Sequence, residues 1–175
     1  MTLRYFAYGS NLHPVRLKER TPSCRLISVA KLFEHRLCFH KKSRDGSAKA
    51  NAFYTGRPAD HVMGVIYEMD GSDKGLLDEF EGLGNGYLDK KTIVENNTGS
   101  QTVFTYVAEE NYISDSLNPF IWYKELVLRG ARFHQFPEDY INQIVEVDPI
   151  QDPDDKRNQK NRYLLEKMGT KKQIL

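Results

Sequence analysis

Apolar and aromatic residues recur in short runs along the first two thirds of the chain, and turn-forming residues separate these runs. The segments with strand character are residues 4–8, 27–33, 36–40, 52–55, 62–69, 87–94 and 102–107. Pairs such as Asp45-Gly46 and Asp70-Gly71 mark turns between them. The last two runs, extended to 90–95 and 102–108, are expected to form a hairpin around residues 96–100.

Four further segments show helical spacing of their apolar residues: 13–20, 72–81, 119–130 and 137–147. Pro14 suits the first position of a helix, and Gly82 and Gly130 are expected to end the second and third helices. Strands dominate the first half of the chain and helices the second. This order predicts an α+β fold in which a mixed or antiparallel sheet closes into a small β-barrel with flanking helices.

The composition changes after residue 148. Residues 151–160 contain almost no apolar side chains, whereas residues 163–168 contain several. We therefore expect one domain over residues 1–150 and a polar C-terminal tail over residues 151–175. The tail is expected to be loose, apart from one amphipathic turn at 163–168 that packs on the body.

The charge balance and cysteine content narrow the class of protein. The chain has 25 Lys and Arg against 24 Asp and Glu, so no global field favours nucleic acid or an acidic membrane. No apolar stretch approaches the ~20 residues that span a bilayer, and the first residues lack the layout of a signal peptide. The two cysteines, Cys24 and Cys38, are expected to be reduced, and the basic run 41–44 to be a solvated loop. These features predict a cytoplasmic protein that binds neither nucleic acid nor membrane.

The five histidines form neither a metal-ligand spacing nor a cluster with the cysteines, and the chain has no phosphate-binding glycine motif. We therefore expect no metal and no cofactor. Two other segments carry candidate chemistry.

The first segment is Tyr8-Gly9-Ser10-Asn11, where a strand runs directly into a turn. Gly9 is expected to adopt backbone angles closed to other residues, and the turn before a helix would point backbone N–H groups outward. Such N–H groups can hold a carboxylate or a phosphate. Taken alone, however, a Gly-Ser-Asn stretch is typical of an ordinary turn.

The second segment is Leu77-Asp78-Glu79-Phe80-Glu81-Gly82. Asp78 and Glu81 share one helix face at a spacing of three, whereas Glu79 points elsewhere. Glu81 would lie at the C-terminal end of the helix, whose dipole opposes a negative charge. That position suits a carboxylate that carries protons, although from spacing alone the three acids also fit a solvated helix face.

Four stretches together resemble the gamma-glutamylcyclotransferase family: Tyr5 to Leu12, Val62 to Tyr67, Leu77 to Gly82, and Tyr123-Lys124. The resemblance extends from residue 4 to about residue 148. It rests on the combination of Tyr-Gly-Ser-Asn-Leu with Asp-Glu-x-Glu-Gly, since either motif alone is weak. It implies a small mixed barrel with flanking helices, in agreement with the fold expected from the pattern.

The resemblance also implies roles for individual residues. Glu81 matches the catalytic acid and base. The residues implied to bind substrate are Tyr5, Phe6, Ala7, Tyr8, Gly9, Ser10, Asn11 and Tyr123, with Tyr87 as a weaker match. The implied reaction is the cofactor-free cyclisation of a small γ-glutamyl substrate to 5-oxoproline, by a monomer or homodimer.

Three alternatives remain open at this point. The substrate could be a γ-glutamylamine or a γ-glutamyl-protected metabolite, or the protein could bind such a molecule without turning it over. Asn11 argues against the glutathione-specific branch, which usually departs from Asn after Tyr-Gly-Ser. The leaving group is expected at the rim of the pocket, against the loops 41–49 and 82–86.

Overall fold

The computed structural model describes residues 1–170 and contains all seven strands and all four helices expected from the pattern. The strands are β1 (Thr2–Ala7), β2 (Arg25–Phe33), β3 (His35–Lys42), β4 (Ala48–Tyr54), β5 (His61–Asp70), β6 (Tyr87–Asn96) and β7 (Gly99–Ala108). The helices are α1 (Pro14–Arg20), α2 (Lys74–Glu81), α3 (Ile121–Phe133), α4 (Glu138–Val145) and α5 (Asp155–Thr170). Two short 3₁₀ turns, η1 (Gly71–Asp73) and η2 (Glu110–Tyr112), precede α2 and follow β7.

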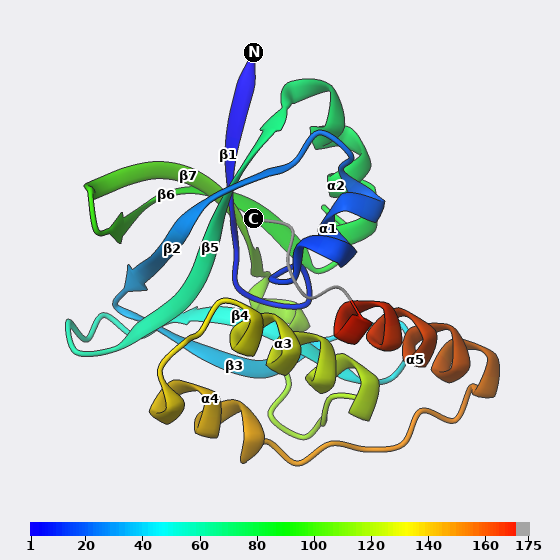
Figure 1. Ribbon diagram of the computed structural model, residues 1–175. Helices are drawn as coiled ribbons and strands as arrows, with labels where there is room; N and C mark the ends of the chain where they lie inside the picture. The colour runs from blue at the N-terminus through cyan, green and yellow to red at the C-terminus, as the bar shows by residue number, and fades with distance from the viewer. Residues whose placement is uncertain (171–175) are drawn as a thin grey trace.

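Five strands close into a barrel in the order β1-β5-β2-β6-β7 (Figure 1). Neighbouring strands are antiparallel except at the closure, where β1 runs parallel to β7 and Tyr5 pairs with Phe104. The expected hairpin is confirmed, because β6 and β7 pair along their whole length from Tyr87–Ala108 to Asn96–Gly99. Strands β3 and β4 form a separate two-stranded sheet. The predicted mixed barrel with flanking helices is therefore confirmed.

The core lies inside the barrel and between the barrel and its helices. Phe6 and Ala7 of β1 are fully buried, as are Val65 and Ile66 of β5. Helix α3 adds its own apolar face, with Leu126 fully buried. Each buried Phe, Val, Ile or Leu side chain contributes about 1.5–3 kcal/mol by leaving water, and an Ala methyl group less, so β1 is held firmly where its last residues enter the turn at Gly9.

Helix α3 does not end at Gly130, as the sequence analysis expected, but continues to Phe133. Gly130 lies inside the helix, and the residue must be glycine because Leu12 packs against it: a Cβ at residue 130 would stand 2.4 Å from the Cβ of Leu12. The glycine therefore serves a close approach between α3 and the segment after the turn.

The expectation of a loose tail is wrong for residues 155–170, which form the 16-residue helix α5. Leu164, Leu165 and Met168 are buried, so the expected packing of residues 163–168 on the body is confirmed. Arg129 of α3 donates a hydrogen bond to the carbonyl of Leu165, at 2.6 Å. The polar composition misled because one narrow apolar stripe suffices to dock a helix on an existing body. The expectation for residues 171–175 lies outside the described residues.

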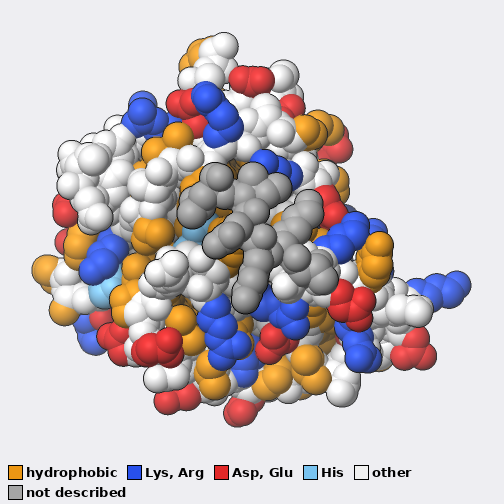
Figure 2. All heavy atoms as spheres, in the orientation of Figure 1, with side chains coloured by type: hydrophobic (Ala, Val, Ile, Leu, Met, Phe, Trp, Pro, Cys, Tyr) orange, Lys and Arg blue, Asp and Glu red, His pale blue; other side chains and the backbone are white. Residues whose placement is uncertain are grey.

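The surface shows no field of one sign on the face seen in Figure 2, where Lys and Arg side chains alternate with Asp and Glu. Within residues 1–170, every helix is too short or too polar to cross a lipid bilayer.

Candidate functional site

The turn after β1 is shaped by a close approach and not by unusual backbone angles. Gly9 does not have a positive φ, so the expected reason for a glycine at this position is wrong. A Cβ at Gly9 would stand 3.2 Å from the Cβ of Ala50 on β4 and 3.6 Å from the hydroxyl oxygen of Tyr123. Glycine is therefore required here because β4 and α3 press against the turn.

The turn leaves backbone donors without partners. The N–H of Leu12 donates to the carbonyl of Gly9 at 3.1 Å, which closes the turn. The N–H groups of Gly9, Ser10 and Asn11 have no hydrogen-bond acceptor among residues 1–170. Backbone N–H groups in buried surroundings are almost always paired, so three successive free donors form a suitable cradle for an anionic or carbonyl oxygen.

Glu81 is the last residue of α2, and Gly82 ends the helix with a φ of 69°. The Glu81 side chain is 16% exposed. Its Oε1 accepts a hydrogen bond from Asn11 Nδ2 at 2.8 Å and lies 2.7 Å from Arg20 Nη1. The carboxylate therefore faces the turn and accepts a hydrogen bond from one of its residues, Asn11.

The other two acids of the segment have different surroundings. Asp78 accepts a hydrogen bond from the Tyr106 hydroxyl at 2.6 Å and pairs with Lys74. Glu79 is exposed. The predicted division of faces is confirmed, and Glu81 differs from both neighbours in facing a pocket.

The walls of this pocket are tyrosines whose hydroxyls hold backbone groups. Tyr123 Oη accepts a hydrogen bond from the N–H of Ala50 at 3.0 Å, and burial raises the pKa of Tyr123 to about 12. Tyr87 donates to the carbonyl of Ala50 and Tyr8 to the carbonyl of Tyr106. Burial raises the pKa of Tyr87 and of Tyr8 well above the ordinary value. These hydroxyls are neutral near pH 7 and fix the pocket's shape.

The residues that line the pocket come from β1, the turn, β4, α2, β6, β7 and α3: Tyr5, Tyr8, Gly9, Ser10, Asn11, Ala50, Glu81, Tyr87, Tyr106 and Tyr123. Of the residues implied to bind substrate, the structure brings all but Phe6 and Ala7 to this pocket. Those two point into the core. Tyr87, the weaker match, lies in a barrel strand and also lines the pocket.

Sequence reasoning missed Ala50, Tyr106 and Arg20. Arg20 has no motif signal, because its contact with Glu81 joins residues 61 positions apart. The cavity between the lining residues measures about 20 Å³, which is room for about one water molecule.

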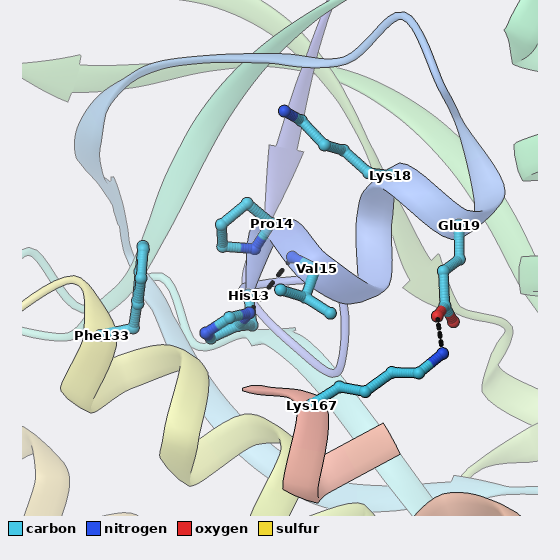
Figure 3. Close-up of a pocket in the computed structure, with 7 residues that line it drawn as sticks. All are labelled: His13, Pro14, Val15, Lys18, Glu19, Phe133 and Lys167. Carbon is cyan, nitrogen blue, oxygen red and sulfur yellow. Dashed lines mark hydrogen bonds and ion pairs between the residues drawn. The ribbon is translucent and has the colours of Figure 1, made fainter. Parts of the chain in front are cut away.

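A larger cavity of about 410 Å³ lies between α1, the end of α3 and Lys167 of α5 (Figure 3). His13 lies in it beside Phe133, and Glu19 pairs with Lys167 at 3.4 Å. Burial lowers the pKa of His13 to about 4, and its Nδ1 accepts the hydrogen bond that caps α1. These groups are engaged in structure, so the candidate chemistry lies in the smaller pocket.

Metal binding has no support in the described part of the chain, where His, Cys, Asp and Glu side chains form no group of three or more that could hold an ion.

The fold is a closed barrel in which one carboxylate, that of Glu81, faces a turn with free backbone N–H groups. Comparisons with known proteins find the same class of fold. Residues 61–144 match the AIG2-like family. A solved gamma-glutamyl cyclotransferase structure superposes with a TM-score of 0.79 at 27% identity, covering 93% of this chain and 99% of that chain.

Sequence relatives narrow the class further. The gamma-glutamylcyclotransferase of Bos taurus is 31% identical over 149 residues, which cover 83% of this chain and 78% of the relative. The enzyme of the same name from Homo sapiens is also 31% identical, over 151 residues and with the same coverage. The chain belongs to the gamma-glutamylcyclotransferase family.

Proposed function

We propose that this protein is a gamma-glutamylcyclotransferase, which converts the γ-glutamyl group of a small substrate to 5-oxoproline and releases a free amino acid. The observation that supports it best is the direct contact between Glu81 and the turn, since Asn11 Nδ2 lies 2.8 Å from Glu81 Oε1. Family membership and the coverage of the relatives agree with this activity.

The reaction is intramolecular. The α-amino nitrogen of the glutamyl group attacks its own γ-carbonyl carbon, a C–N bond of the five-membered ring forms, and the bond to the leaving nitrogen breaks. Ring closure supplies its own proximity, so the protein needs no nucleophile and no second reactant. Its tasks are to hold the substrate and to move protons.

Glu81 suits the proton transfers because it is the single carboxylate among the residues that line the pocket within residues 1–170. In the proposed sequence, Glu81 takes a proton from the α-ammonium group and gives it to the leaving nitrogen. The ring nitrogen loses its second proton along the same route, so the amino acid leaves with its amine protonated. A group that first accepts and then returns a proton is general base and general acid in turn.

The turn suits the binding task. The free N–H groups of Gly9, Ser10 and Asn11 can hold the glutamyl carboxylate or the oxygen that becomes negative as the ring closes. The buried tyrosines exclude water around these groups. Asn11 belongs to the turn and donates a hydrogen bond to Glu81, so it fixes the position of the proton-transfer group relative to the binding groups.

The experiment that tests the activity is incubation of the purified protein with a set of γ-glutamyl amino acids and γ-glutamylamines, followed by measurement of 5-oxoproline. Release from at least one γ-glutamyl amino acid is expected. Tight binding of these compounds without 5-oxoproline would instead support a non-catalytic binding protein, and the lack of both binding and release would overturn the proposal.

A further inference from the structure

Lys41 lies at the end of β3 and is buried, although the sequence analysis placed it in a solvated basic run. Only 6% of Lys41 is exposed, whereas its neighbour Lys42 is exposed on the other side of the strand. The expectation for the run 41–44 is therefore wrong at its first residue.

The Lys41 ammonium group lies against two aromatic rings and forms no ion pair with any residue that the structure describes. Burial lowers the pKa of Lys41, and the charges of Glu81, Asp45 and Glu109 offset this only in part. Its Nζ lies 4.5 Å from the ring centroid of Tyr87 and 5.8 Å from that of Tyr112. By contrast, Lys49 and Lys74 form ion pairs, with Asp45 and with Asp78. No carboxylate in residues 1–170 makes such a pair with Lys41. An aromatic ring stabilises a cation, but burying an ammonium group without an anion in direct contact is costly, so this position suits an added anion.

This cation stands beside the pocket. Tyr87, whose ring it faces, lines the pocket together with Glu81. The Lys41 side chain also fills the space next to Gly86, where a Cβ would lie 3.0 Å from Nζ. The side chain of Arg44 donates a hydrogen bond to that of Asn85. The loops 41–49 and 82–86, expected at the rim of the pocket, therefore meet each other at Lys41.

The glutamyl end of a substrate has other groups to hold it. The free N–H groups belong to the turn after β1, and Arg16 lies on α1 one helical turn before Arg20, on the face that reaches Glu81. The Arg16 Nε is buried and has no hydrogen-bond partner. Burial and the nearby Arg20 lower the pKa of Arg16, so a bound anion at this position would stabilise the charged guanidinium group. Lys41 approaches from β3 and is left for a second anionic group.

We infer that Lys41 binds the carboxylate of the leaving amino acid, so that the pocket selects γ-glutamyl α-amino acids over γ-glutamylamines. The inference rests on the proposed cyclotransferase activity. Such a substrate carries two carboxylates: the turn and Arg16 receive the one on the glutamyl group, and Lys41 receives the one on the leaving group. A γ-glutamylamine lacks the second carboxylate and leaves Lys41 unpaired.

Two matched substrates test this directly: γ-glutamylalanine and γ-glutamylethylamine, which differ only in the carboxylate of the leaving group. For the unmodified protein, kcat/KM is expected to favour the alanine compound by about 10- to 100-fold, the usual worth of one charged hydrogen bond. In Lys41→Met this ratio should fall close to one, through loss of turnover of the alanine compound. Lys42→Met is the matched control, since Lys42 is exposed, and it should keep the original ratio.

The other outcomes are distinguishable. An unchanged ratio in Lys41→Met, or an equal loss with both substrates, would mean that Lys41 only packs against its aromatic neighbours, and would overturn the inference. A preference of the unmodified protein for the ethylamine compound would overturn it as well. No 5-oxoproline from either compound with the unmodified protein would instead count against the proposed function itself.

Discussion

Glu81 and Arg20 form an ion pair beside the pocket, with Oε1 and Nη1 2.7 Å apart and side chains 16% and 15% exposed. The same Nη1 lies 3.0 Å from Asn11 Oδ1, so one guanidinium nitrogen bonds to both the carboxylate and the turn. The Arg20 guanidinium also stacks 5.1 Å from the ring centroid of Phe80. These contacts fix the orientation of the carboxylate to which we assign proton transfer.

Replacing Glu81 tests its role in proton transfer. Glu81→Gln keeps the size of the side chain and removes its ability to accept a proton, so turnover is expected to fall by about 10²–10⁴-fold. The measurement is 5-oxoproline release from a γ-glutamyl amino acid. Glu79→Gln on the exposed face is the control and should remain within about twofold of the original rate. Near-normal turnover in Glu81→Gln would exclude the assigned role.

Replacing Arg20 tests whether it positions Glu81. Arg20→Met keeps an unbranched apolar side chain but removes both hydrogen bonds and the guanidinium contact with Phe80, and kcat is expected to fall by about 10- to 100-fold with a smaller change in KM. Arg20→Lys should restore part of kcat, because it keeps the charge but not the geometry of the guanidinium group.

Arg25→Met removes another ion-paired arginine, whose side chain is 72% exposed, and serves as the control for general effects of losing an arginine. A change in KM alone in Arg20→Met would assign Arg20 to substrate binding and contradict the positioning role.

Replacing Gly9 tests the close approach between the turn and β4. In Gly9→Ala the new methyl group would stand 3.2 Å from the Cβ of Ala50, so the turn or β4 must shift by a few tenths of an ångström. We expect about tenfold lower kcat/KM, since small displacements of binding groups are costly, and about 1 kcal/mol lower free energy of unfolding.

The double variant Gly9→Ala/Ala50→Gly removes the opposing methyl group and should recover most of both losses. Gly75→Ala, at a position with no neighbouring atom within 4 Å, is the matched control and should not lose activity. If the double variant were no better than Gly9→Ala, the contact with Ala50 would not be the cause.

His13 is expected to make stability depend on pH. Burial, His134 and Arg129 together lower the pKa of folded His13 from 6.5 to about 4. Between these values the unfolded chain binds the proton more readily, so the stabilisation is complete above about pH 6.5 and is lost as the pH falls to about 4, by about 3 kcal/mol. Protonation also removes the acceptor for the N–H of Val15.

The measurement is the free energy of unfolding by denaturant between pH 4 and 7. His13→Asn keeps a side-chain oxygen that can cap α1 and should flatten part of this slope. The remainder is expected from His134 and His35, whose pKa values burial also lowers. An unchanged slope in His13→Asn would contradict the assignment.

Local pattern was sufficient for the seven strands, for the first four helices apart from the end of α3, and for most of the pocket. The strand runs, the helix starts and the stop at Gly82 depend on residues close together in the chain, and these elements lie where the pattern placed them. The two motifs at residues 8–12 and 77–82 identified Glu81 and the turn, because the chemistry of each motif is carried by neighbouring residues. The resemblance then supplied Tyr123.

Contacts between distant residues could not be predicted from such patterns. Arg20 pairs with Glu81, Ala50 leaves no room for a side chain at Gly9, and Leu12 leaves none at Gly130. These contacts exist only because the fold brings distant segments of the chain together. The burial of Lys41 and the docking of α5 have the same origin. The residue types along the chain determined the elements and the candidate chemistry; tertiary packing decided which charges are buried without a partner, because burial depends on every segment that covers a side chain.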